Sequence, residues 1–161
     1  MNLLFYDFEV TIYDWLVTII DPTNRKEYYF ENDPEGLIDF YDEHKTDIWI
    51  GCNNHHYDDY ILKGILCDFD PYDINEHIIT KKLEGWKYSN LFRKIPLISY
   101  DIMTRIDRGL KVWEGFLGNM IKESSTDFGH LFCHISRDFG LRSNGIAKIM
   151  SAACVNSGFG N

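Results

Sequence analysis

Two acidic residues stand two positions apart inside an apolar run near the start of the chain. Asp7 and Glu9 flank Phe8 within the segment Asn2–Val10, which predicts a strand buried along most of its length. Because side chains alternate across a strand, both carboxylates are expected on one face and Phe8 on the other. Adjacent like charges on an apolar strand are costly, and a divalent cation is the usual compensation. The spacing therefore predicts a Mg²⁺ or Mn²⁺ site, with a solvated pair of surface acids as the alternative.

A second group of polar residues follows the short apolar segment 47–51. Asn53, Tyr57 and Asp58 stand where this predicted strand gives way to a helix. Site residues are common at such strand-to-helix junctions in α/β folds. The spacing places Asp58 in the first turn of the helix, where the helix dipole alone also favours an acid. Asp58 is therefore interpreted either as a site residue or as an ordinary helix-start acid.

The hydrophobic pattern predicts a mixed α/β domain that would hold these residues. The expected elements are strands over 2–10, 15–20 and 27–30, a helix over 34–44, a strand over 47–51, helices over 56–67 and 74–83, a strand over 95–102 and a helix over 109–117. The first three strands, joined by short turns, are expected to form an antiparallel meander flanked by helices, which resembles the way a ribonuclease H-like domain begins. We expect one domain over 1–150 and a frayed tail over 151–161.

Composition limits the classes of function. With 161 residues, 45% of them hydrophobic, the chain is long enough for one folded domain and unlike a disordered one. Its net charge of −9 is the wrong sign for a protein that coats nucleic acid, so any such contact is expected to be local and mediated by metal ions. No apolar run reaches the length of a membrane span. Four cysteines without a C-x-x-C pair, and no signal peptide, predict a reduced cytoplasmic protein.

The two polar groups together resemble the motifs of a known enzyme class. The D-F-E sequence at 7–9 is similar to the first motif of the DEDD superfamily of 3′–5′ exonucleases. The N-x-x-x-Y-D sequence at 53–58 is similar to the second motif in the proofreading domains of family B DNA polymerases. The segment Gly109–Gly118 resembles a stretch between the second and third motifs of phage replication exonucleases. The resemblance covers residues 1–126.

This resemblance implies a ribonuclease H-like fold and a two-metal exonuclease that removes nucleotides from the 3′ end of single-stranded DNA. In that superfamily four carboxylates hold two metal ions, which clamp an in-line displacement at phosphorus. The resemblance assigns Asp7, Glu9 and Asp58 as catalytic metal ligands for Mg²⁺ or Mn²⁺. It assigns Asn53 and Tyr57 to contacts with the substrate. A separate polymerase is an expected partner.

A third motif should supply the fourth acid, with a Tyr or His that orients the water nucleophile. Its superfamily forms are Y-x-x-x-D and H-x-x-x-x-D on a late helix. This chain offers His134 and Asp138, which have the spacing of the tyrosine form and would share one face of a helix. Asp127 is a further candidate for the fourth acid. Asp101, at the end of an apolar run, is either a site residue or a polar strand end.

The departures in the third motif leave other functions open. The chain could be a truncated or diverged relative that keeps the fold without the activity, because a fold does not determine a function. Such an acidic protein could occupy the basic nucleic-acid channel of a host or defence nuclease, since carboxylates can mimic phosphates. It would then be a binding or inhibitory protein, for example a phage anti-defence protein. A third hypothesis is a subunit that receives its fourth acid from a partner or a second copy.

Overall fold

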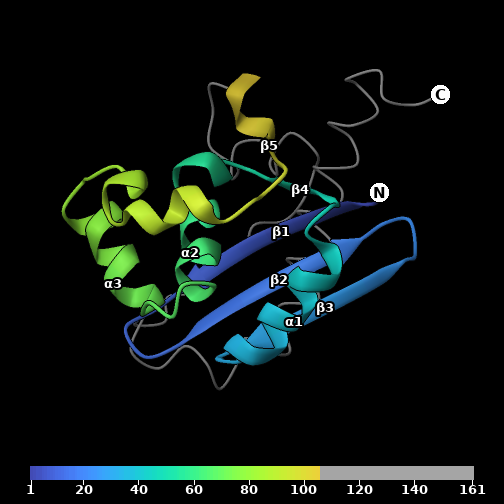
Figure 1. Ribbon diagram of the computed structural model, residues 1–161, viewed down its shortest axis with the longest axis horizontal. Coiled ribbons are helices and arrows are strands. Elements are labelled where there is room, and N and C mark those ends of the chain that lie inside the picture. Colours follow the sequence, from blue (N-terminus) through green and yellow to red (C-terminus); the bar gives the residue numbers. More distant parts are fainter. Residues whose placement is uncertain (106–161) are drawn as a thin grey trace, which may run out of the picture. The chain divides into compact units, whose positions relative to one another are not determined.

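A five-stranded mixed sheet carries the fold (Figure 1). The computed structural model describes residues 1–105, of which Met1–Asp101 form one unit. The strands are β1 (Leu3–Val10), β2 (Trp15–Asp21), β3 (Lys26–Glu31), β4 (Ile48–Gly51) and β5 (Ser99–Asp101). Their order is β3-β2-β1-β4-β5, with β2 antiparallel to both neighbours and β1, β4 and β5 parallel to one another. The predicted mixed sheet with an antiparallel meander at its start is confirmed.

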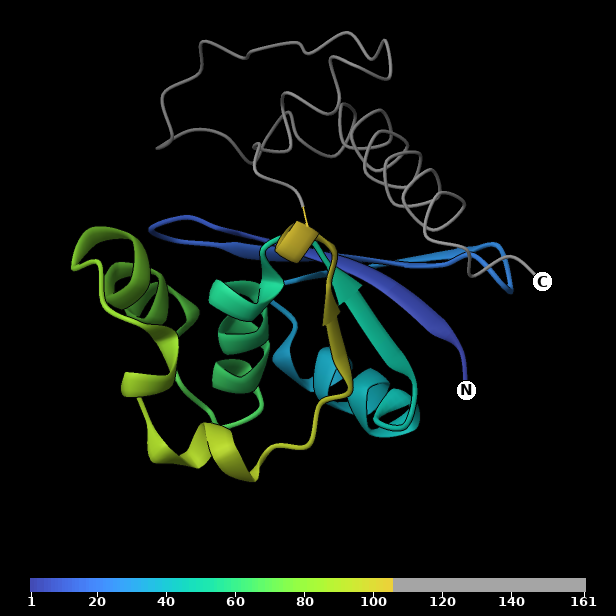
Figure 2. The same ribbon diagram turned by 90° about the horizontal axis from the view of Figure 1, so that it is seen from above.

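The helices are short and lie on one face of this sheet (Figure 2). They are α1 (Pro34–His44), α2 (Asp58–Ile65) and α3 (Pro71–Asn75), with a π-helical turn at Glu76–Thr80 and 3₁₀ turns at Asn54–His56, Gly85–Lys87 and Asn90–Lys94. A further 3₁₀ turn, Ile102–Arg105, follows β5 in the chain and belongs to a second unit. None of the helices within residues 1–105 is long and apolar enough to cross a membrane. The described fold is therefore an α/β arrangement of one sheet and one layer of helices.

Two helices begin at other positions than the sequence predicts. α2 begins at Asp58, two residues after the predicted start, because Asn53 adopts a left-handed φ of 66° and a 3₁₀ turn precedes the helix. α3 begins at Pro71, three residues before the predicted start. Here the Asp70 side chain accepts the backbone N–H of Tyr72 at 2.8 Å and caps the helix. In both places side-chain hydrogen bonding and turn geometry outweigh the apolar spacing on which the prediction rested.

The strand predicted over 95–102 is also shorter than expected. Only its later part forms β5, because Pro96 has no N–H group to donate to a neighbouring strand. The remaining predictions concern the helix over 109–117, the tail over 151–161 and the candidates Asp127, His134 and Asp138. These lie outside the described residues, as does the end of the domain predicted over 1–150.

The core lies between the sheet and the helices. Alternate residues of β1 and β2 point to this face and are buried: Leu4, Tyr6, Phe8, Trp15, Val17 and Ile19. They pack with buried residues of the helical layer and β4: Leu37, Phe40, Tyr41, Trp49, Ile61, Leu62, Ile65 and Ile74. Because Asp7 and Glu9 alternate with the buried residues of β1, they lie on the opposite face of the strand, as predicted.

Candidate functional site

Three parallel strands stop at the same end of the sheet, and the predicted acids lie at that end. β4 ends at Gly51, which pairs with Asp101 at the end of β5. β1 continues beyond both, because Phe5 is the last of its residues to pair with β4, opposite Ile50. Asp7 and Glu9 therefore project from the part of β1 that extends past the ends of its two parallel neighbours. Ligands of open α/β folds bind outside the carboxyl ends of such strands.

Asp58 occupies the edge of β1 that β4 leaves unpaired. It is the first residue of α2 and its exposed fraction is 4%. Its Oδ1 accepts the backbone N–H of Phe8 at 2.9 Å, which brings the carboxyl next to Asp7. The residues three, four and seven positions later on α2 are also buried, namely Ile61, Leu62 and Ile65. Helical spacing therefore places Asp58 on the buried face of the helix rather than on the solvated one.

The carboxyl of Asp58 has a pKa well above its usual range. Burial is the largest cause, and the negative charge of Asp7 raises the pKa further. The hydrogen bond from the Phe8 N–H acts in the opposite direction but does not offset these two effects. Ionisation of Asp58 next to another acid is therefore unfavourable. Acids perturbed by both burial and a specific charged neighbour are typical of functional sites.

Tyr57 lies among the same acids. Its hydroxyl donates to Oδ1 of Asn75 at 2.8 Å, and its ring is half-buried. Burial raises the pKa of Tyr57, and the charges of Asp58, Glu9 and Asp7 raise it further. All three acids are thus near this phenol, with the Glu9 side chain exposed. The structure brings together four residues that the sequence assigned to the site.

A buried acid holds the loop that contains Asn53. Asp101, with an exposed fraction of 3%, accepts the backbone N–H of Asn53 on Oδ1 at 2.8 Å. Its Oδ2 accepts the backbone N–H of His55 at 3.4 Å. The side chain of Asn53 is exposed at this end of the sheet, so it is accessible to a substrate. Of the two alternatives predicted for Asp101, the structure shows a strand-end residue, but a buried one that binds the site loop.

The same acids also affect the pKa of the Cys52 thiol. Burial raises its pKa, and the charges of Asp101, Asp7 and Asp58 contribute to a value of about 11. Three carboxylates from three separate elements therefore act on one small group. The sequence did not single out this residue, because its position among the acids depends on how β1, β4 and β5 end.

A buried polar network beside the site was not predicted. Asn54 is fully buried, and its Nδ2 donates to Oγ of Ser99 at 2.7 Å and to Oδ1 of Asp59 at 3.0 Å. The hydroxyls of Ser99 and Tyr6 donate to the same Asp59 oxygen. A signal was present in the sequence, because the apolar residue Leu62 follows Asp59 by three positions and places it toward the core. The partners on the other strands carried no such signal.

A buried hydroxyl lies across from Asp7 on the neighbouring strand. Thr18 pairs with Asp7 between β1 and β2, so their side chains share one face of the sheet. Thr18 has an exposed fraction of 5%, and within the described part of the chain its Oγ1 has no hydrogen-bond partner. Such an unsatisfied group costs about 1–3 kcal/mol. A polar ligand next to Asp7 would satisfy it.

The described acids do not form a complete metal centre by themselves. Within residues 1–105, no three His, Cys, Asp or Glu side chains lie close enough together to hold a metal ion. The donor types do fit Mg²⁺ or Mn²⁺, because Asp7 and Asp58 offer hard carboxylate oxygens, and the hydroxyl of Thr18 lies across from Asp7. The predicted third motif, His134 and Asp138, lies outside this part of the chain. The metal assignment therefore stays a prediction.

Comparisons of the chain with protein-family models, with curated proteins and with solved structures found no match.

Proposed function

We propose that this chain is a two-metal-dependent 3′–5′ exonuclease that acts on single-stranded DNA ends. The observation that supports it most is the buried carboxyl of Asp58, whose pKa is raised by burial and by Asp7 at the carboxyl ends of the parallel strands. Two acids held together in this way are unfavourable unless a cation joins them. Glu9 and Tyr57 lie at the same end of the sheet, and both belong to the segments that resemble motifs of the exonuclease superfamily.

The sheet supports the ribonuclease H-like part of the proposal. β1, β2 and β3 form an antiparallel meander, and the chain then crosses over to add β4 and β5 parallel to β1. This is the order expected for the start of a ribonuclease H-like domain. The carboxyl end of β1 and the start of α2, which carry the two motifs, lie at the same end of the sheet.

The residues at this end of the sheet divide into two roles under the proposal. Asp7, Glu9 and Asp58 would hold the metal ions, and bound Mg²⁺ or Mn²⁺ would supply Lewis-acid stabilisation of the phosphodiester and an acidified water nucleophile. The exposed amide of Asn53 would hydrogen-bond to the terminal nucleotide. The half-buried ring of Tyr57, fixed by its bond to Asn75, would limit where that nucleotide can lie.

A cleavage time course tests the proposal. The substrate is a single-stranded DNA oligonucleotide labelled at its 5′ end, with Mg²⁺ or Mn²⁺ added. Wild type should produce a ladder of shortening products, and Asp7→Ala should not. Asp47→Asn is the matched control, since Asp47 is a buried acid at the opposite end of the sheet. A folded wild-type protein that leaves the oligonucleotide intact with both metals would contradict the proposal.

A second candidate function is that of an acidic binding protein built on the same fold. It is favoured by the net charge of −9 and by the departure of His134 and Asp138 from the superfamily's third motif. Such a protein would bind the basic channel of a nuclease through its carboxylates. The cleavage assay separates the two candidates, because this one predicts no products. It also predicts a stable partner in a pull-down from host lysate at low salt, and recovery of none would exclude it.

A further inference from the structure

β5 holds the β4–α2 loop at two points. Asp101 accepts two backbone N–H groups of the loop, including that of Asn53 at 2.8 Å. Ser99, two positions earlier and on the same face of β5, accepts from Nδ2 of Asn54 at 2.7 Å and donates to Asp59 at 2.9 Å. Both contacts are buried or half-buried, so water does not replace them readily. A strand of only three residues thus fixes the backbone and a side chain of the loop that leads into α2.

From this arrangement we propose that Asp101 is a positioning residue that determines where the Asp58 carboxyl lies. Asp101 binds the N–H of His55, and only two residues separate His55 from Asp58. Asp58 in turn accepts the N–H of Phe8 on β1. The contacts therefore run from β5 through the loop to β1. The inference rests on the proposed function, since the placement of Asp58 is what a metal site there requires.

The contacts of Asp101 assign it to the loop rather than to the substrate. Each of its two oxygens accepts a backbone N–H, and both donors belong to the segment that precedes α2. Asn53 in this loop adopts a positive φ of 66°, a conformation in which Asn is more common than most residues other than glycine, and Asp101 binds its N–H in that turn. Removal of the carboxylate would free two donors and relax the turn. Asp58 would then lose its fixed distance from β1.

Substitution of an acid with a purely structural role should affect stability alone, and Asp47 serves as that comparison. Asp47 is a buried acid like Asp101, and it also accepts a backbone N–H, that of Asn2 at 2.6 Å. Asp47 lies at the opposite end of the sheet, where β4 begins. A variant at Asp47 should therefore lower the stability of the fold without moving Asp58, whereas a variant at Asp101 should do both.

The experiment measures amide hydrogen exchange by NMR in wild type, Asp101→Asn and Asp47→Asn, all as full-length chains. The reporter is the amide of Phe8, which donates to Asp58. The reference is the amide of Trp49, which donates to the Ile98 carbonyl at 2.8 Å and exchanges only if β5 detaches. Mn²⁺ affinity is measured on the same proteins by calorimetry. If Asp101→Asn does not fold, Asp101→Glu replaces it, because the longer side chain displaces the carboxylate and keeps its charge.

We expect Phe8 in Asp101→Asn to exchange at least about tenfold faster relative to Trp49, and Mn²⁺ affinity to fall about 10- to 100-fold, the usual range for outer-shell residues. Asp47→Asn should leave both unchanged. Unchanged Phe8 exchange in Asp101→Asn would overturn the inference, as would equal effects of Asp47→Asn. If wild type neither binds Mn²⁺ nor cleaves DNA while Phe8 exchange still rises, the proposed function fails and the positioning of Asp58 by Asp101 is upheld.

Discussion

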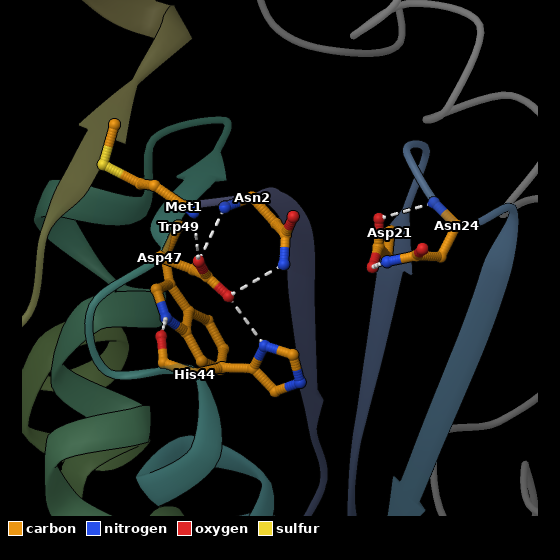
Figure 3. A network of polar contacts seen from close by, with 7 residues as sticks. All are labelled: Met1, Asn2, Asp21, Asn24, His44, Asp47 and Trp49. Carbon is orange, nitrogen blue, oxygen red and sulfur yellow. Dashed lines mark hydrogen bonds and ion pairs between the residues drawn. The ribbon is translucent and has the colours of Figure 1, made fainter.

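At the end of the sheet where β1 and β4 begin, the buried carboxylate of Asp47 is surrounded by hydrogen-bond donors (Figure 3). It accepts the backbone N–H of Asn2 at 2.6 Å, and Nδ1 of His44 lies 2.8 Å from its other oxygen. Burial raises the pKa of Asp47, but the hydrogen bonds from His44 and Asn2 outweigh it and hold the pKa below its usual value. Asp21, also drawn in Figure 3, is held in the same way by Asn24.

At the end where β1, β4 and β5 stop, the buried carboxyl of Asp58 has a neighbouring acid instead. Burial and the charge of Asp7 raise its pKa, and the Phe8 N–H does not offset them. The hydrogen-bond donors around Asp47 more than offset the effect of its burial, whereas the single donor to Asp58 from β1 does not. The difference indicates that ionised Asp47 stabilises the fold and that ionised Asp58 does not, as expected if Asp58 serves a ligand. Active sites commonly lower stability in this way.

The largest difference between the two ends should appear in catalysis. Asp58→Asn keeps the shape and the acceptor for Phe8 but removes the charge, so we expect the cleavage rate to fall by about 10³-fold or more, as for the loss of a metal ligand worth several kcal/mol. Asp47→Asn should cleave at a rate within about twofold of wild type, once stability is allowed for. Initial rates on the labelled oligonucleotide measure both. Equal losses in the two variants would show that the two ends do not differ in function.

Stability without metal should change in opposite directions in the same two variants. Asp47→Asn removes a charged acceptor from Asn2 and His44, and we expect a loss of about 1–3 kcal/mol. Asp58→Asn removes a buried charge beside Asp7, and we expect a gain of about 1 kcal/mol or more. Urea unfolding of the metal-free proteins measures both values. Destabilisation by Asp58→Asn would mean that its charge is compensated in the fold, and the contrast between the ends would be lost.

The pH dependence of these effects should also separate the ends. The folded-state pKa of Asp47 is lowered, so its stabilisation is present above the unfolded value of about 3.9 and is lost as the pH falls through the folded value. The folded-state pKa of Asp58 is raised, so its ionisation is destabilising above that pKa and the penalty disappears on acidification. As the pH falls, the stability gained by Asp58→Asn should therefore shrink first. The stability lost by Asp47→Asn should shrink only at a lower pH. Unfolding midpoints followed from about pH 8 to about pH 2 cover both changes, and a deficit of Asp47→Asn that shrinks first would contradict this order.

A smaller effect is expected at Thr18, the unsatisfied hydroxyl opposite Asp7. Thr18→Val keeps the shape of the side chain and removes a polar group without a partner, so the metal-free protein should gain about 1 kcal/mol. Cleavage should slow, because a hydrogen bond to the substrate or to ordered water would be lost. Unfolding and cleavage measured on one preparation test the pair of effects. A stabilised variant with unchanged cleavage would place Thr18 outside the site.

The sequence predicted much of this carboxyl end because its signals are local. Period-two alternation placed Asp7 and Glu9 on the face of β1 opposite Phe8, and the structure confirms it. The spacing of apolar residues along α2 was enough to predict the helix that carries Asp58. What these residues share is that their positions depend on neighbours within a few residues in the chain.

The contacts that hold the site could not be predicted, because they join distant segments. Asp101 and Asn53 are 48 residues apart, and Asp59 meets Tyr6 across 53 residues. No period or spacing in a single sequence records which strand will lie beside which loop. The amino-end partners of Asp47 were missed for the same reason, since Asn2 meets it only when β1 pairs with β4.

Thermal unfolding with and without Mn²⁺ tests the central claim most directly, because an ion that binds only the folded state raises the midpoint. Mn²⁺ should raise the Tm of wild type and of Asp47→Asn by the same amount, and should leave that of Asp58→Asn unchanged. This result would show that the carboxyl end binds the ion through the acid that the fold disfavours. A wild-type Tm that does not respond to Mn²⁺, or an equal rise in all three proteins, would contradict a metal site at Asp58.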